Sequence, residues 1–451
     1  MPGIINASTI YSVLGNNSSL IPIGIKDVAN SCGMTTASYI AGDTVEGKDR
    51  FFDEFGTMAI WLGGIPIYKY LLDNTMFKVA KVDPKVDVRI LKDKNILQAA
   101  KELAPTEEIK KSIEKAANNP KLFKNMALAK FGLSTVLTMV SYFALTKFRH
   151  KYTENQIKKD FLANQNSNKY TGNVPFSSAF SDVHKPKQAS FTGGLQDFMF
   201  DPVKNLMIVD GVITGERFAH SRNPQDFMGY VIKEGAFWLF MYWAGQLISD
   251  AMEKHAEKKY NKSIDLDARV IEHQDLKEAL KNGTLKQHIE AFKNADTSDA
   301  DLYKYAVKHH EDNLVAKMAK ESDIITMMKK PKYNIPIIGG ILKEKTDKVD
   351  TRAFIELGTD EVDKFGGLRG VCKKLEKLLN QYEHRKPDED IDTFMRAVRK
   401  LKRASVLKNM GACIGALGVL APALMLLLRQ FGDNSEYQVK KDVEAKLKAN
   451  A

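Results

Sequence analysis

A run of 20 consecutive uncharged residues, NMGACIGALGVLAPALMLLL at positions 409–428, restricts the fold of this chain more than any other feature. As an α-helix this run would reach about 30 Å, the thickness of the hydrocarbon core of a bilayer. Pro422 within it is tolerated in a membrane because neighbouring helices satisfy the freed carbonyl group. Gly411, Gly415 and Gly418 either permit close approach of another helix or simply fill space. The run therefore predicts a transmembrane helix.

Three further apolar segments accompany it. Residues 126–145 are interrupted only by Lys130, which can extend its ammonium group to the head groups, so a second span is expected there. Residues 57–72 and 227–249 are shorter or carry charges. These two segments are consistent with spans, with interfacial segments or with core helices of a soluble protein.

Lys233 and Glu234 lie near the start of the segment at 227–249. Ionisable residues inside a membrane are costly and often functional. Close to a segment end, however, both side chains can face the head groups, which is the interpretation favoured by their position. If they are buried instead, they mark a polar membrane site.

Short sequence motifs, here called words, recur in the same order in the two halves of the chain. The most extensive match pairs Glu154-x-Gln-Ile-Lys-Lys-Asp160 with Glu436-x-Gln-Val-Lys-Lys-Asp442, and Lys-Asn-Met occurs at both 124–126 and 408–410. Asp-x-Arg occurs at 87–89 and again at 267–269. Ordered matches of this kind indicate an internal repeat. We therefore predict an all-α integral membrane protein built by tandem duplication of a unit with two apolar segments.

The spacing between matched words grows by about 100 residues in the second half, which predicts an insertion there. The expected organisation is an N-terminal arm (1–40), repeat 1 (41–162), a flexible linker (163–205), the first part of repeat 2 (206–281), an inserted, mostly helical extramembrane domain (282–385), and the second part of repeat 2 with a basic tail (386–451). With two crossings per copy, the copies would be parallel repeats; if the segments at 57–72 and 227–249 only dip into the bilayer, the copies would be inverted.

The formal net charge is +11. The basic residues flank the apolar segments and show no nucleic-acid-binding pattern, so lipid head groups are the expected partner and nucleic acid is not. The candidate contacts with anionic lipid are Arg396, Arg399, Lys400, Lys402 and Arg403, for which a solvated helix face is the alternative. A small excess of Lys and Arg near the connections within each repeat places those connections in the cytoplasm.

No catalytic motif is present. The sequence lacks GxxxxGK(S/T), HExxH and GxSxG patterns, and its three cysteines are widely spaced. In His309-His310-Glu311-Asp312, adjacent histidines on a helix would diverge by about 100° and could not readily share a metal ion. We therefore expect no cofactor and a non-enzymatic membrane protein with a structural, partner-binding or lipid-binding role, with a homo-oligomer as one form. The alternative is a small transporter or channel, with polar groups such as Lys233, Glu234, Ser134 and Thr138 between the repeats.

Overall fold

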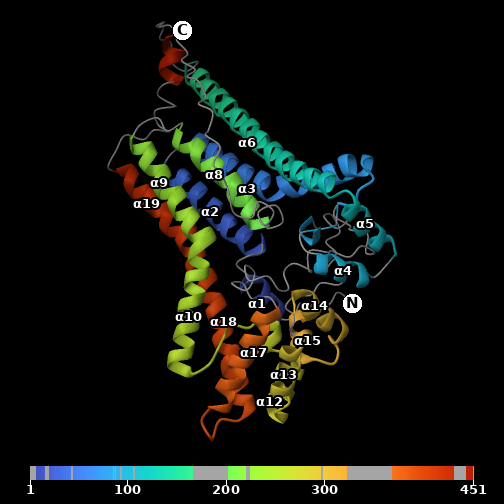
Figure 1. Cartoon of the computed structure of the whole chain (residues 1–451). Coiled ribbons are helices and arrows are strands. Elements are labelled where there is room, and N and C mark those ends of the chain that lie inside the picture. Colours follow the sequence, from blue (N-terminus) through green and yellow to red (C-terminus); the bar gives the residue numbers. More distant parts are fainter. Residues whose placement is uncertain are drawn as a thin grey trace, which may run out of the picture. The chain divides into compact units, whose positions relative to one another are not determined.

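A computed structural model gives the fold of the chain (Figure 1). It describes residues 7–15, 20–41, 44–84, 86, 88–91, 94–104, 107–165, 202–219, 224–295, 298–321, 368–430 and 443–449. Within these ranges the protein is all-helical, with 89% helix and no strands, which confirms the predicted fold class at this level. Most of the predicted linker and of the basic tail, including the repeated word at 436–442, lies outside the described residues.

The first half of the chain contributes α1 (Ala7–Gly15), α2 (Leu20–Ala41), α3 (Thr44–Leu72), η1 (Asp73–Phe77), η2 (Val88–Leu91), α4 (Lys94–Glu102), α5 (Glu107–Asn118) and α6 (Pro120–Gln165). The second half contributes α8 (Pro202–Ala219), α9 (Pro224–Trp238), η3 (Leu239–Trp243), α10 (Ala244–Tyr260), α11 (Ala268–Ile271), α12 (Gln274–Asn282), α13 (Leu285–Asn294), α14 (Asp299–Lys308), α15 (Leu314–Glu321), α17 (Leu368–Glu383), α18 (Ile391–Gly415), η6 (Ala416–Leu420) and α19 (Ala421–Gln430). Here η1, η3 and η6 are π-helical turns, whereas η2 is a 3₁₀ turn.

The chain forms two compact units, each assembled from distant segments. Unit 1 contains residues 1–15, 71–130 and 248–408, and unit 2 contains residues 16–70, 131–247 and 409–451. Unit 2 has a core to which α2, α3, α6, α8, η3 and η6 contribute. The buried members of that core are Ile23, Trp61, Ile65, Tyr142, Leu206, Val209, Ile213, Met241 and Leu417.

Unit 1 is held by short amphipathic helices. Helices α13, α15 and α17 pack on one another, and α4 packs on α5 and α14. Leu276, Leu285, Phe292 and Leu375 are fully buried, as their helical spacing predicts. Every described helix of the predicted insertion, from α13 to α17, belongs to this unit.

Within the predicted N-terminal arm (1–40), residues 7–15 and 20–40 are helical. Helix α1 lies in unit 1 and α2 in unit 2, and α2 buries Ile23, Met34 and Ala37. In the sequence, two Asn and two Ser residues at 16–19 separate α1 from α2.

Two helices in the described part are long and apolar enough to cross a membrane. These are Pro120–Ala163 and Ile391–Leu428, and they contain the predicted spans at 126–145 and 409–428. The segments at 57–72 and 227–249 also form helices, but these do not meet the same test, so four spans are not established. The most apolar windows of the two long helices are only 22% and 28% buried, unlike the core helix of a soluble protein.

Helix α2 approaches η6 closely in unit 2. A Cβ placed on Gly33 would overlap the carbonyl oxygen of Gly418 and lie 2.8 Å from Cγ of Pro422. Pro422 has no amide hydrogen to bond the Gly418 carbonyl, and the helix has a π-helical turn at 416–420, just before this proline. The glycine on α2 therefore lies where the helix opposite is irregular.

Two stretches of unit 1 have their helical elements at corresponding positions 180 residues apart. Lys81 and Asn261, with φ of 52° and 50°, are the non-glycine residues with positive φ in the described ranges. Each is followed by a four-residue helical turn (η2 and α11) and then by a nine-residue helix (α4 and α12). Burial corresponds as well, since Val86, Val88, Ile90, Ala99 and Ala100 are buried, as are Leu266, Ala268, Val270, Ala279 and Leu280.

Candidate functional site: a buried charged cluster

Unit 2 encloses ionisable side chains from five helices. We name this group the buried charged cluster; its members are Asp27 of α2, Arg50, Asp53 and Glu54 of α3, Arg149 of α6, Asp210 and Arg217 of α8, and Lys233 and Glu234 of α9. Burying a charge costs several kcal/mol unless it is paired. The pairing within the cluster therefore decides what it can do.

Lys233 and Glu54 form its most buried ion pair. Lys233 Nζ donates to Glu54 Oε1 at 2.5 Å, and the two side chains are 2% and 5% exposed. Arg50 Nη1 lies 3.6 Å from the same oxygen. The pair joins α9 to α3, helices assigned to different predicted repeats.

Arg217 and Arg149 hold two further carboxylates. Arg217 donates to Glu234 Oε1 at 2.5 Å and to Asp53 Oδ2 at 3.5 Å. Arg149 Nη1 lies 2.7 Å from the other oxygen of Asp53. Each of these three acids, Asp53, Glu54 and Glu234, thus has a cation within 4 Å.

A chain of neutral donors fixes the side of Glu234 that Arg217 leaves open. Trp238 Nε1 donates to Thr214 Oγ1 at 3.0 Å, and Thr214 Oγ1 donates to Glu234 Oε2 at 2.9 Å. Both carboxylate oxygens of Glu234 are therefore hydrogen-bonded. Such satisfaction is what allows a charge to remain buried.

Asp27 and Asp210 differ from the other acids of the cluster. In the described ranges, neither carboxylate forms an ion pair with a Lys or Arg side chain. Asp210 accepts a hydrogen bond from the hydroxyl of Tyr242, a neutral donor. Both residues are buried, with 7% and 5% of their surface exposed. They line a small cavity of about 30 Å³, together with Asn30, Glu54, Lys233 and Glu234.

The cavity size limits what it can hold. A buried water needs about 10–15 Å³ of such volume, so there is room for one or two waters or one small ion. Asn30, 2% exposed, lines the cavity, and its Oδ1 accepts no hydrogen bond. An organic substrate would not fit in this arrangement.

Lys233 and Glu234 do not face lipid head groups, so the interpretation favoured by their position was wrong. Both are buried and paired with residues of α3 and α8. Sequence reasoning missed the remaining members. The available signal was Lys26-Asp27, the one charged pair in the 22 residues of α2. Ser134 and Thr138 do not line the cavity, because their hydroxyls bond to carbonyls of their own helix, those of Phe131 and Ser134.

The candidate packing glycines behave differently from one another. Gly418 lies 3.1 Å, measured from a built Cβ, from the carbonyl oxygen of Ala29 on α2. At Gly411 and Gly415, an added Cβ would meet nothing within 4 Å. Close approach thus occurs at the third glycine, and its partner Gly33 was not identified from the sequence.

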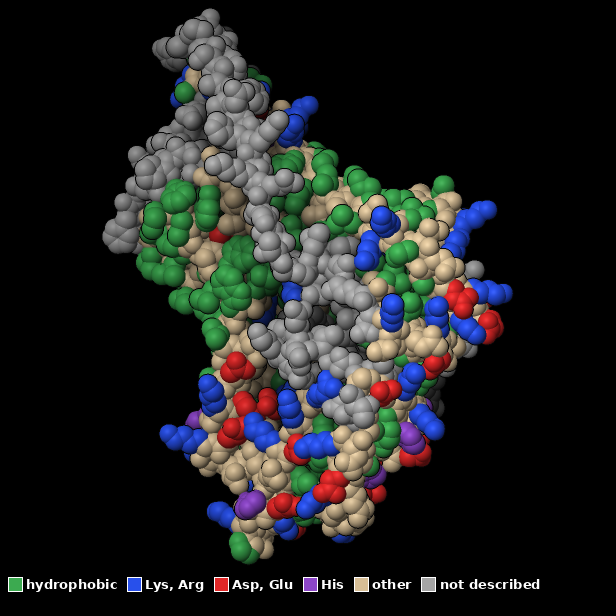
Figure 2. Space-filling view, in the orientation of Figure 1, with side chains coloured by type: hydrophobic (Ala, Val, Ile, Leu, Met, Phe, Trp, Pro, Cys, Tyr) green, Lys and Arg blue, Asp and Glu red, His purple; other side chains and the backbone are tan. Residues whose placement is uncertain are grey.

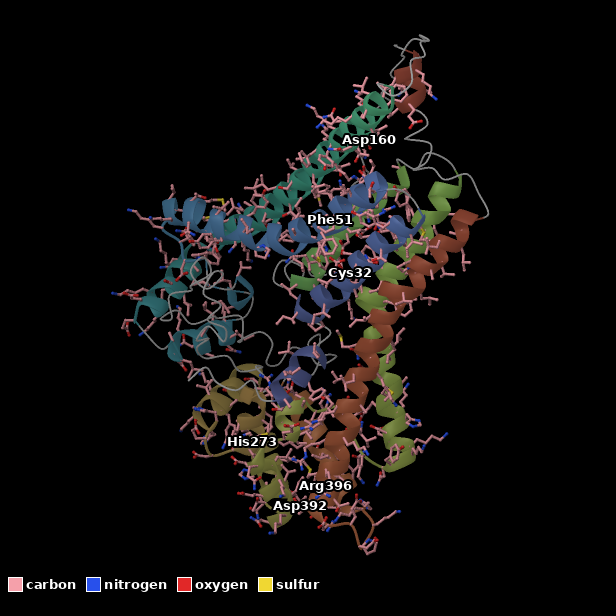
Figure 3. All side chains as sticks on the ribbon, turned by 180° about the vertical axis from the view of Figure 1, so that it is seen from behind. Cys32, Phe51, Asp160, His273, Asp392 and Arg396 are labelled. Carbon is pink, nitrogen blue, oxygen red and sulfur yellow. The ribbon has the colours of Figure 1, made fainter. Side chains whose placement is uncertain are left out.

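The candidate lipid contacts on α18 divide into exposed and internally bonded residues. Arg396 is exposed one turn after Asp392 (Figure 3), and Lys400 is exposed as well. Arg403 donates to Glu272 Oε1 at 2.5 Å, Lys402 donates to the Ile264 carbonyl at 2.7 Å, and Arg399 donates to the Met395 carbonyl at 3.2 Å. Three of the five candidate lipid-contact residues therefore form hydrogen bonds within unit 1.

A second polar group, around Glu253, fastens helices within unit 1. Glu253 accepts hydrogen bonds from Ser263 Oγ at 2.8 Å and Ile264 N at 2.7 Å, and Lys377 Nζ of α17 approaches it to 3.1 Å. Burial raises the pKa of Glu253. Burial alone would lower the pKa of Lys377, but hydrogen bonds to Glu257 and Glu253 raise it above its usual value. These contacts join α10 to α17.

In the described ranges, no three or more His, Cys, Asp or Glu side chains are grouped to hold a metal ion. His309 and His310 pair instead with the adjacent acids Asp312 and Glu311, at 3.9 and 2.9 Å. Comparison of the chain with protein-family models, curated protein sequences and solved structures finds no match.

Proposed function

We propose that the chain is a non-enzymatic integral membrane protein that acts through contacts with lipid and with partner proteins. The observation that carries this proposal is the exposure of large apolar side chains along the two long helices. Val136, Val140, Val419 and Leu420 are each more than half exposed. Figure 2 shows hydrophobic side chains gathered over α9 and α19 of unit 2. A face of this kind is normal in lipid and unfavourable in water.

The distribution of charge in unit 2 supports the same proposal. Its charged cluster is buried and its four cations are paired with Asp53, Glu54 and Glu234, while aliphatic side chains lie outside. Ionisable residues in membrane helices face the bundle interior and pair with one another. Unit 1 has the opposite arrangement, with apolar cores and charged surfaces typical of contact with water.

Alkaline carbonate extraction of membranes tests this proposal. The full-length chain is expected to remain in the pellet and to be released only by detergent. Recovery in the carbonate supernatant would overturn the proposal. Purification in mild detergent tests the interaction role, for which a stable partner or a homo-oligomer is the expected result and an isolated monomer the contrary one.

The predicted tandem duplication belongs to this proposal. It is supported by the matching stretches at 81–102 and 261–282, which agree in positive φ, helix bounds and buried positions at a constant spacing of 180. Accidental sequence matches in a lysine-rich chain would not also agree in helix bounds and buried positions. An experimental structure in which the two stretches do not superpose would refute the duplication.

A small transporter or channel is the second candidate, and the charged cavity favours it. Its lining groups come from α2 of the predicted arm, from α3 of repeat 1, and from α8 and α9 of repeat 2, and therefore include both predicted copies. Transporters built from repeats place ion sites at such junctions. Ion flux into liposomes containing the purified protein tests this candidate, and flux equal to that of empty liposomes would exclude it.

A further inference from the structure

The cavity of unit 2 has the chemistry of a site for one small cation. We propose that it binds a single monovalent cation, either a proton or an alkali-metal ion, between the carboxylates of Asp27 and Asp210. The inference does not depend on transport, because a bound cation can be detected in the purified protein.

Charge pairing is the first step of the argument. The four basic members of the buried charged cluster lie within 4 Å of Asp53, Glu54 or Glu234. Asp27 and Asp210 have no such partner in the described part of the chain and face the same cavity. A buried carboxylate without a counter-charge is strongly unfavourable, so a positive charge is needed there.

An independent polar group points into the same space. Asn30 lies one turn after Asp27 on α2, so the two side chains share a helix face. Its Oδ1 is buried and receives no hydrogen bond. A carbonyl-type oxygen is a ligand for an alkali-metal ion and an acceptor for a water that carries a proton.

The surrounding groups limit the occupant to one charge. The titratable and charged groups that face the two carboxylates are Glu54 of α3, Arg217 of α8, Lys233 and Glu234 of α9, and Tyr242 of η3. Lys26, beside Asp27, donates instead to the Met241 carbonyl at 3.3 Å. Lys233 and Arg217 would repel a divalent ion, and the cavity volume leaves room for little more than one small ion.

Thermal unfolding of the detergent-purified full chain tests the site in two arms. In the alkali-metal arm, NaCl or KCl replaces choline chloride at constant ionic strength and pH 9. In the proton arm, the pH falls from 9 to 5 in choline chloride. A saturable rise of the unfolding temperature in either arm supports the proposal, and the responding arm identifies the cation.

Variants assign the response to the site. Asp27→Asn and Asp210→Asn are expected to abolish it, whereas Asp160→Asn, at an exposed position of α6, should keep it. Asn30→Ala, which changes no charge, should weaken an alkali-metal response at least tenfold in apparent affinity. If the aspartate variants do not fold, two other measurements test the site. Asn30→Ala tests the alkali-metal ion, and infrared detection of a protonated carboxyl group in the wild type tests the proton. An unchanged unfolding temperature of the wild type in both arms would overturn the proposal. So would a response of Asp27→Asn and Asp210→Asn that equals the response of the wild type.

Discussion

Glu54 shows at the scale of one residue how the interior of unit 2 is stabilised. Its carboxylate neutralises Lys233, whose side chain is 2% exposed. Replacing Glu54 by Gln would leave a buried ammonium group without its counter-ion. We expect a loss of about 3–5 kcal/mol in the free energy of unfolding, measured by denaturant titration in detergent.

An exposed pair provides the matched control for this variant. Glu154 and Lys158 lie one turn apart on α6, 3.1 Å from each other and about half exposed. Glu154→Gln is expected to change stability by no more than about 0.5 kcal/mol. Equal losses in the two variants would contradict the assignment of the Glu54 pair to a desolvated interior.

His288 gives unit 1 a dependence on pH. Burial lowers the pKa of His288, and its Nδ1 accepts a hydrogen bond from Leu314 N at 3.4 Å, which only the neutral ring can do. The unfolded chain therefore binds a proton more readily than the folded chain. The stabilising contribution is complete above the unfolded pKa of about 6.5 and is lost as the pH falls below it.

Lowering the pH from 7.5 to 5 should therefore destabilise the wild type relative to His288→Gln, in which no ring is protonated. The difference between the thermal midpoints of the two proteins measures this effect, because the acids of unit 2 contribute equally to both. His255→Gln changes an exposed histidine of α10 and should follow the wild type. If the thermal midpoint depends on pH in the same way in all three proteins, groups other than His288 cause the acid sensitivity.

Residue-level prediction from the sequence succeeded only in part for physical reasons. Lys233 and Glu234 are conspicuous because charges interrupt an apolar segment, but their partners Glu54 and Arg217 lie 179 and 17 positions away. No local pattern specifies which distant charges will meet. Asp27 could have been suspected, since α2 is otherwise almost uncharged.

Gly33 determines the packing between two elements, α2 and η6. A side chain here would collide with the Gly418 carbonyl, a backbone group that cannot turn aside. Gly33→Ala is therefore expected to cost about 1–3 kcal/mol in unfolding free energy through overpacking. Gly411→Ala, where a Cβ would meet nothing within 4 Å, should be neutral or stabilising by up to about 1 kcal/mol. Denaturant unfolding of the two variants distinguishes them, and a larger loss at Gly411 would refute this packing.

Helices themselves were the most predictable elements. The run at 409–428 and the spaced apolar residues of α17 indicate helices from composition and period alone. The π-helical turn at 416–420 and the contact of Gly418 with α2 could not be derived, because both depend on the helix packed opposite. The same limit explains why Gly411 and Gly415 could not be distinguished from Gly418.

For the whole molecule, the sequence indicated an all-helical chain but not its division into units. Each unit takes residues from three separate stretches of the chain, whereas the predicted domains were continuous except for repeat 2, which was expected in two parts. Long helices cause this difference, since α6 and α18 each contribute residues to both units. Periodicity identifies a helix but does not show where along its length the neighbours change.

The proposed membrane location of the whole molecule predicts an unusual response to a surface mutation. Val419 is 68% exposed within the most apolar helix. In lipid, Val419→Lys would cost about 2.5–3.5 kcal/mol on insertion. In water, the same change at an exposed position would alter stability by only about 0.5 kcal/mol. We therefore expect a reduced carbonate-resistant fraction for Val419→Lys and an unchanged fraction for Val79→Lys, whose site in unit 1 is 84% exposed. Equal membrane retention of both variants would mean that the exposed face around Val419 does not contact lipid.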